Sequence, residues 1–102
     1  MDYVAFLKLR QSASAAERDA GLARRAAWRY PAGIRLIAEY WPAAGDVQVV
    51  SIFSADTFGP ILETVLEWND IFEIDVHPAV GADEGLQLGA EAFGRLSRFQ
   101  TG

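Results

Sequence analysis

Alternation of apolar and polar residues predicts four β-strands. The alternation is clearest in three segments that are rich in β-branched and aromatic residues: YVAFLKL at 3–9, GIRLIAEYW at 33–41 and VQVVSIFS at 47–54. The run PAAGD at 42–46 has the composition of a turn, so the second and third strands form a hairpin. Residues 71–79, which include EIDVHPA, form the fourth strand.

A helix is predicted between the first two strands. Ser14 and Glu17 have the spacing of a capping box, and Pro31 ends the helix because the residue before a proline avoids the α region. An apolar stripe at helical spacing is expected to form its inner side, with the arginines elsewhere: Ala16, Ala20, Ala23, Ala27 and Tyr30.

A second helix follows the hairpin. We expect Asp56 to cap it, Pro60 to lie in its first turn, and the helix to end near Trp68, Asn69 and Asp70, with Asn69 able to adopt the left-handed conformation. Its buried side is expected to consist of Phe58, Ile61, Leu62, Val65 and Leu66.

A last helix begins at Asp83 and Glu84 and has one apolar face, made of Leu86, Ala90, Phe93 and Leu96. Its three glycines each weaken it by about 1 kcal/mol relative to alanine. We therefore expect this helix to dock alongside the rest of the fold.

The order of elements is β-α-β-β-α-β with one extra C-terminal helix, which predicts a single α+β domain over residues 1–102 with the ferredoxin-like arrangement. In this arrangement four antiparallel strands carry helices on one face only. Strict alternation assigns these residues to the other, open face: Phe6, Lys8, Arg35, Ile37, Glu39, Trp41, Gln48, Val50, Ile52, Glu73, Asp75 and His77. Because this face mixes large apolar side chains with charges, we expect a homodimer in which two sheets face each other.

Composition excludes several functions. The chain has a net charge of −5 and no concentrated block of Lys or Arg, so nucleic acid is not an expected partner. It has no cysteine, which removes disulfide and thiolate chemistry, and no apolar run approaches the length of a membrane span. We therefore expect a cytoplasmic protein.

Three segments carry a family resemblance: GIRLIAEYW, the turn EWND at 67–70, and the strand end HPAV at 77–80. Over about residues 2–80 the chain resembles a family of bacterial proteins known only as a domain of unknown function. The resemblance places that family in the dimeric α/β-barrel superfamily, which includes cofactor-independent monooxygenases, isomerases, haem enzymes and ligand-binding regulators. Because this chain has none of their catalytic motifs, the resemblance implies a fold and no site residues.

Metal binding is not expected. Glu73, Asp75 and His77 share one side of a strand, but three alternate residues span about 13 Å, too far for one ion. We predict no cofactor. His77, the only histidine, is the best candidate for acid–base catalysis, with Asp75 or Glu39 beside it. The alternative interpretation is that His77 lies at the end of a strand and only forms hydrogen bonds. Lys8, which is expected opposite Glu73 or Asp75, indicates a cross-strand charge pair.

Two functions follow from this pattern, and a domain that serves only for dimerisation is a third possibility. The first is binding of a small molecule in a pocket at the sheet, either beneath the helices or between two facing sheets. The second is a cofactor-independent enzyme, similar to a monooxygenase or an isomerase, that uses a His–carboxylate pair in that pocket. The predicted ligand-binding residues are Phe6, Arg35, Glu39, Trp41, Asp75 and His77.

Overall fold

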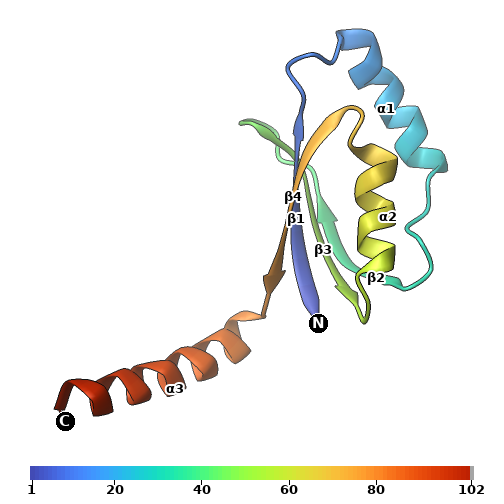
Figure 1. Ribbon diagram of the computed structural model, residues 1–102. Helices are drawn as coiled ribbons and strands as arrows, with labels where there is room; N and C mark the ends of the chain where they lie inside the picture. Colours follow the sequence, from blue (N-terminus) through green and yellow to red (C-terminus); the bar gives the residue numbers. More distant parts are fainter. Residues whose placement is uncertain (102) are drawn as a thin grey trace.

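The computed structural model describes the backbone of residues 1–101 and the side chains of residues 1–98. The elements are β1 (Asp2–Leu9), α1 (Ala15–Ala27), β2 (Ile34–Tyr40), β3 (Val47–Ala55), α2 (Gly59–Trp68), β4 (Phe72–Ala79) and α3 (Ala82–Thr101). The strands form one antiparallel sheet in the order β2-β3-β1-β4, and α1 and α2 cover one of its faces (Figure 1). This is the ferredoxin-like α+β fold that the hydrophobic pattern predicted.

The two sides of β4 are those that the alternation predicted. Val76 lies beside Ala5 of β1 in the register, on the side that faces the helices, and His77 lies beside Val4 on the open side. Lys8 is the direct neighbour of Glu73, as expected for an antiparallel pair of these strands. On the helix side, the buried core consists of Ala5, Phe53, Ala55 and Ile61.

Helix α1 begins as predicted but faces the sheet with a different side. The Ser14 side chain accepts a hydrogen bond from the Glu17 backbone N–H, and the Glu17 side chain accepts one from the Ser14 backbone, so the capping box is present. The expected inner stripe was wrong, because its four alanines are exposed: Ala16, Ala20, Ala23 and Ala27. The side toward the sheet contains Arg18, Leu22 and Arg25 instead. A methyl group buries little area, whereas a long arginine stem covers apolar surface and brings its charged end to a partner.

Helix α2 has Pro60 in its first turn, as predicted, but its cap and its buried side differ from expectation. Phe58 is the N-cap residue and makes no side-chain capping bond, so Asp56 does not cap the helix. Ile61 and Trp68 are the buried residues of α2. The expected buried residues Phe58, Leu62 and Leu66 are 68%, 43% and 61% exposed, because the side of the helix that contains Ile61 and Trp68 faces the sheet.

The end of α2 is tied to α1. The Arg24 guanidinium donates to both carboxylate oxygens of Asp70, at 3.1 and 3.0 Å, and lies 4.3 Å from the Trp68 ring centroid. The Trp28 indole N–H donates to the Glu67 carboxylate, and the Trp28 and Trp68 rings meet edge to face at 5.6 Å. Asn69 ends the helix in the right-handed region (φ −71°), so the left-handed stop that we expected was wrong.

Helix α3 does not dock on the rest of the fold, contrary to our expectation. It leaves the end of β4 and runs out on the side of the sheet opposite α1 and α2 (Figure 1). Leu86 and Phe93 on this helix are 75% and 71% exposed. The molecule is accordingly elongated, with a radius of gyration of 17.6 Å, where a compact domain of this length has about 13 Å. The described helices include none that is long and apolar enough to cross a membrane.

Candidate functional site

An irregularity in β2 decides which residues share a face. Leu36 lies opposite Phe53 and Ala38 lies opposite Ile52, so Ile37 is one extra residue on this strand. A bulge of this kind reverses the side to which all the following residues point. Glu39 therefore lies opposite Ser51, on the side of the sheet that faces the helices.

The six predicted ligand-binding residues are consequently divided between the two faces. Glu39 and Trp41 lie beneath the helices, so their assignment to the open face was wrong. Phe6, Asp75 and His77 remain neighbours on the open face, where the His77 ring lies 6.4 Å from the Phe6 ring.

Arg35 is also on the open face but far from His77. It lies on β2, at one edge of the sheet, and its guanidinium donates to the Ser54 hydroxyl at 3.1 Å. His77 lies on β4 at the opposite edge, three strand spacings away, which is about 14 Å. The open face therefore does not bring the charged candidates together around one point.

A cavity of about 260 Å³ lies on the helix side of the sheet. Its wall is mainly apolar, with Leu7 and Phe53 from the sheet, Leu22 from α1 and Val65 from α2. All three tryptophans of the chain also line it: Trp28, Trp41 and Trp68. Because an apolar cavity of about 150 Å³ is sufficient for benzene, this one can hold a compact molecule of one or two rings.

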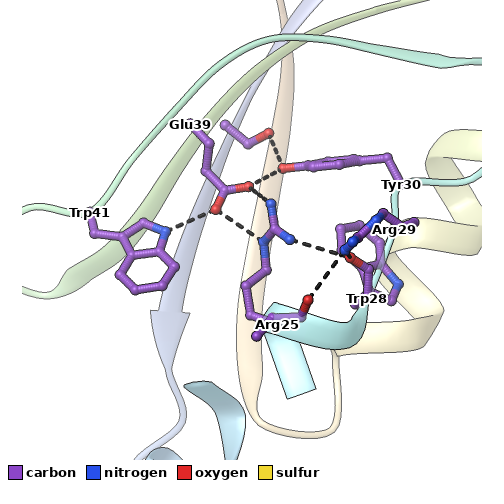
Figure 2. A network of polar contacts seen from close by, with 8 residues as sticks. Arg25, Trp28, Arg29, Tyr30, Glu39 and Trp41 are labelled. Carbon is purple, nitrogen blue, oxygen red and sulfur yellow. Dashed lines mark hydrogen bonds and ion pairs between the residues drawn. The ribbon is translucent and has the colours of Figure 1, made fainter. Parts of the chain in front are cut away.

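One end of the cavity is polar, and Glu39 is its centre (Figure 2). The Arg25 guanidinium donates to both Glu39 oxygens, from Nε at 3.1 Å and from Nη2 at 3.0 Å. The Trp41 indole donates to Glu39 at 2.9 Å and the Tyr30 hydroxyl donates at 2.5 Å. The Tyr30 hydroxyl also lies 2.9 Å from the Ser51 hydroxyl, which attaches the cluster to β3.

These contacts fix the charge of each group. Burial favours the neutral form of Glu39, but the hydrogen bonds from Arg25, Tyr30 and Trp41 outweigh it, so the pKa of Glu39 is lowered. Burial and the hydrogen bond to Glu39 raise the pKa of Tyr30 to about 12. The hydrogen bond to Glu39 raises the pKa of Arg25. At neutral pH the cluster is therefore an ion pair with no net charge and a protonated phenol.

The cluster still has donors to offer. A guanidinium carries five N–H groups, and within the described part of the chain Arg25 uses three of them, two on Glu39 and one on the Trp28 carbonyl at 3.4 Å. Two N–H groups of Arg25, which lines the cavity, are thus without a hydrogen-bond partner among the described residues.

Sequence reasoning missed Arg25, Tyr30 and Ser51. A usable signal was the spacing of Arg18, Leu22 and Arg25, which places all three on one side of a helix. Among the residues that the structure describes, no group of three or more His, Asp or Glu side chains is arranged to hold a metal ion.

Comparison with known proteins gives a family but no activity. Neither the curated proteins nor the solved structures contain a match to this chain. The link to the dimeric α/β-barrel superfamily therefore stays a prediction. A family model described as "Domain of unknown function (DUF3303)" matches residues 1–93, and the chain belongs to that family.

Proposed function

We propose that this domain binds a small, uncharged and largely apolar molecule in the cavity between the sheet and helices α1 and α2. The observation that carries the proposal is a cavity of about 260 Å³ whose wall is mainly apolar, with the Glu39 cluster at one end. The other polar residues that line it are Arg18, Asp19, Gln48 and Thr64. Ligand sites in proteins commonly have this composition, in which apolar walls supply affinity and a few fixed polar groups orient the ligand.

The charge of the cluster limits the class of ligand. Arg25 is already neutralised by Glu39, through the ion pair at 3.0 Å. An anionic ligand would add an unbalanced negative charge to a mainly apolar space, which is costly. A carbonyl or ether oxygen on an aromatic ring system suits the site better, because it accepts a hydrogen bond from Arg25 without adding charge.

The enzymatic alternative receives less support. A catalytic pair of His77 and Glu39 would have to act through the sheet, since these residues lie on opposite faces. The other pair, His77 with Asp75, lies on the open face and does not line the cavity. Glu39 is moreover held in its ionised form by three donors, which makes it a weak base. We therefore propose binding rather than catalysis.

Fluorescence tests the proposal because the three tryptophans line the cavity. Prodan (6-propionyl-2-dimethylaminonaphthalene), an uncharged probe with two fused rings, accepts energy from tryptophan and is expected to brighten when it is titrated into the protein. Val65→Phe fills the cavity and should abolish this signal. Leu66→Phe is the matched control, since Leu66 is the next residue of α2 and is 61% exposed. Absence of probe binding to the wild type, or equal binding by both variants, contradicts the proposal.

Competition against the same probe tests the polar end. 2-Acetonaphthone, which has a carbonyl oxygen, should displace the probe at a lower concentration than naphthalene does. One hydrogen bond corresponds to a difference of about 2- to 12-fold. Arg25→Lys keeps the positive charge but loses the forked donor geometry, so this preference should disappear in that variant. A preference that survives Arg25→Lys would show that Arg25 does not contact the ligand.

A further inference from the structure

Helix α3 is amphipathic, and among residues 1–98, whose side chains the structure describes, none covers its apolar side. At about 100° per residue, Leu86, Phe93 and Leu96 fall on one side of the helix. The charged residues Glu84, Glu91 and Arg95 fall on the other side, together with Leu88. On the apolar side, Leu86, Phe93 and Leu96 are 75%, 71% and 53% exposed.

This helix needs a partner to be stable. It contains Gly85, Gly89 and Gly94, which together cost about 3 kcal/mol relative to alanine. With 20 residues α3 is longer than the about 12–15 residues below which isolated helices are marginal in water, but its three glycines offset that advantage. Most of the stability of such a helix comes from packing its apolar side against another surface.

In the part of the chain that the structure describes, the open face of the sheet has no helix packed on it (Figure 1). Its centre consists of half-buried apolar side chains from β1 and β3: Val4, Phe6, Val50 and Ile52. Tyr40 of β2 lies opposite Val50 of β3 and is 66% exposed. Strands of eight residues are about 27 Å long, which is close to the length of about 30 Å of a 20-residue helix.

We propose that α3 of one molecule covers the open sheet face of a second copy, and that the two copies exchange their helices reciprocally. Figure 1 shows α3 directed away from its own helices, on the open side of the sheet. Half the surface of a helix about 30 Å long and 10 Å wide is about 470 Å². Two helix-on-sheet contacts, each counted on both partners, thus bury about 1,900 Å² in total. This value lies within the range of stable protein interfaces, about 1,200 to 2,000 Å².

The arrangement is symmetric and closed. Each molecule supplies one helix and one sheet face, so a twofold axis satisfies both surfaces and leaves no helix or face uncovered. It differs from a dimer in which two sheets pack directly on each other, because α3 would have no part in that contact.

The oligomeric state of the full-length chain is the first test. Light scattering after size exclusion should give a dimer. Phe93→Asp should weaken the dimer by at least about 30-fold, as expected for a residue at the centre of an interface. Leu88→Asp makes the same kind of change on the other side of α3 and should leave the dimer intact. Circular dichroism should show a loss of helix in Phe93→Asp alone. A monomeric wild type, or equal behaviour of the two variants, overturns the proposal.

A cross-link identifies the surface. Since the chain has no cysteine, the double variant Ile52→Cys and Phe93→Cys introduces the only two thiols. Oxidation should produce a covalent dimer on a non-reducing gel. A disulfide within one chain would show that α3 folds onto its own sheet. A dimer that forms no cross-link would show direct packing of the two sheets. Either result overturns the exchange of helices.

Discussion

Replacing Glu39 by Gln tests whether the Arg25–Glu39 pair stabilises the fold as the structure indicates. The substitution preserves the size of the side chain and removes its charge. The side chains of Glu39 and Arg25 are 12% and 28% exposed, so the pair is intermediate between a fully buried ion pair and an exposed one. Removing one partner of a fully buried pair costs about 3–5 kcal/mol, and an exposed pair contributes about 0.2–1 kcal/mol.

We expect a loss of about 2 kcal/mol in the free energy of unfolding, because Arg25 then lacks its counter-charge and an amide oxygen cannot satisfy all the donors that converge on Glu39. For a domain of this size the loss corresponds to a fall in Tm of about 10 °C. A domain of this length has a total stability of about 5–15 kcal/mol, so the variant should still fold.

Thermal and urea unfolding, followed by circular dichroism, measure the effect. Asp19→Asn is the control, since it neutralises one partner of the Arg18–Asp19 pair, whose side chains are 58% and 67% exposed. This change should cost less than about 0.5 kcal/mol. The double variant Arg25→Met and Glu39→Met should be more stable than either single variant, because no charge is left unpaired. Equal losses in Glu39→Gln and Asp19→Asn would refute the account of the cluster.

Three further predictions concern pH and the backbone. The pKa of Glu39 is lower in the folded state than its ordinary value of 4.5, so the stabilisation by Glu39 is present above pH 4.5 and is lost as the pH falls further. In urea unfolding, the free energies of unfolding of the wild type and of Glu39→Gln should therefore converge in acid. The pKa of Tyr30 rises from 10.0 to about 12, so its stabilisation is complete below pH 10 and is lost toward pH 12; the stability advantage of the wild type over Tyr30→Phe should shrink over that interval, and a constant advantage would contradict the assignment. Gly33 and Gly45 have φ values of 97° and 96°, but only a Cβ at Gly33 would approach Pro60, to 2.7 Å; Gly33→Ala should therefore lower Tm more than Gly45→Ala, and equal shifts would show that the contact with Pro60 is unimportant.

Most of the fold follows from periodicity. The alternation in β4 assigned Val76 and His77 to the correct faces, and the capping box at Ser14 marked the start of α1. These features are local, and each depends on a few adjacent residues. The order of the strands then follows from the ferredoxin-like connection.

The candidate site could not be predicted in the same way. A single extra residue, Ile37, reverses the parity of β2, and an apolar residue in an apolar strand gives no sign of a bulge. Arg25 was placed on the wrong side because a stripe of alanines resembles an inner face, although alanine buries little area. The position of α3 depends on surfaces beyond its own sequence, so its amphipathic pattern indicated only that it requires a partner.

A small molecule bound beneath the helices, where the bulge at Ile37 places Glu39 and Trp41, would lie against all three indole rings. The most direct measurement is a titration of the protein with 2-acetonaphthone, followed by NMR of the indole N–H signals and the His77 ring. We predict that the signals of Trp28, Trp41 and Trp68 shift together, since all three line the cavity, while the signals of His77 on the opposite face do not. Shifts at His77 with unchanged indole signals would contradict the account.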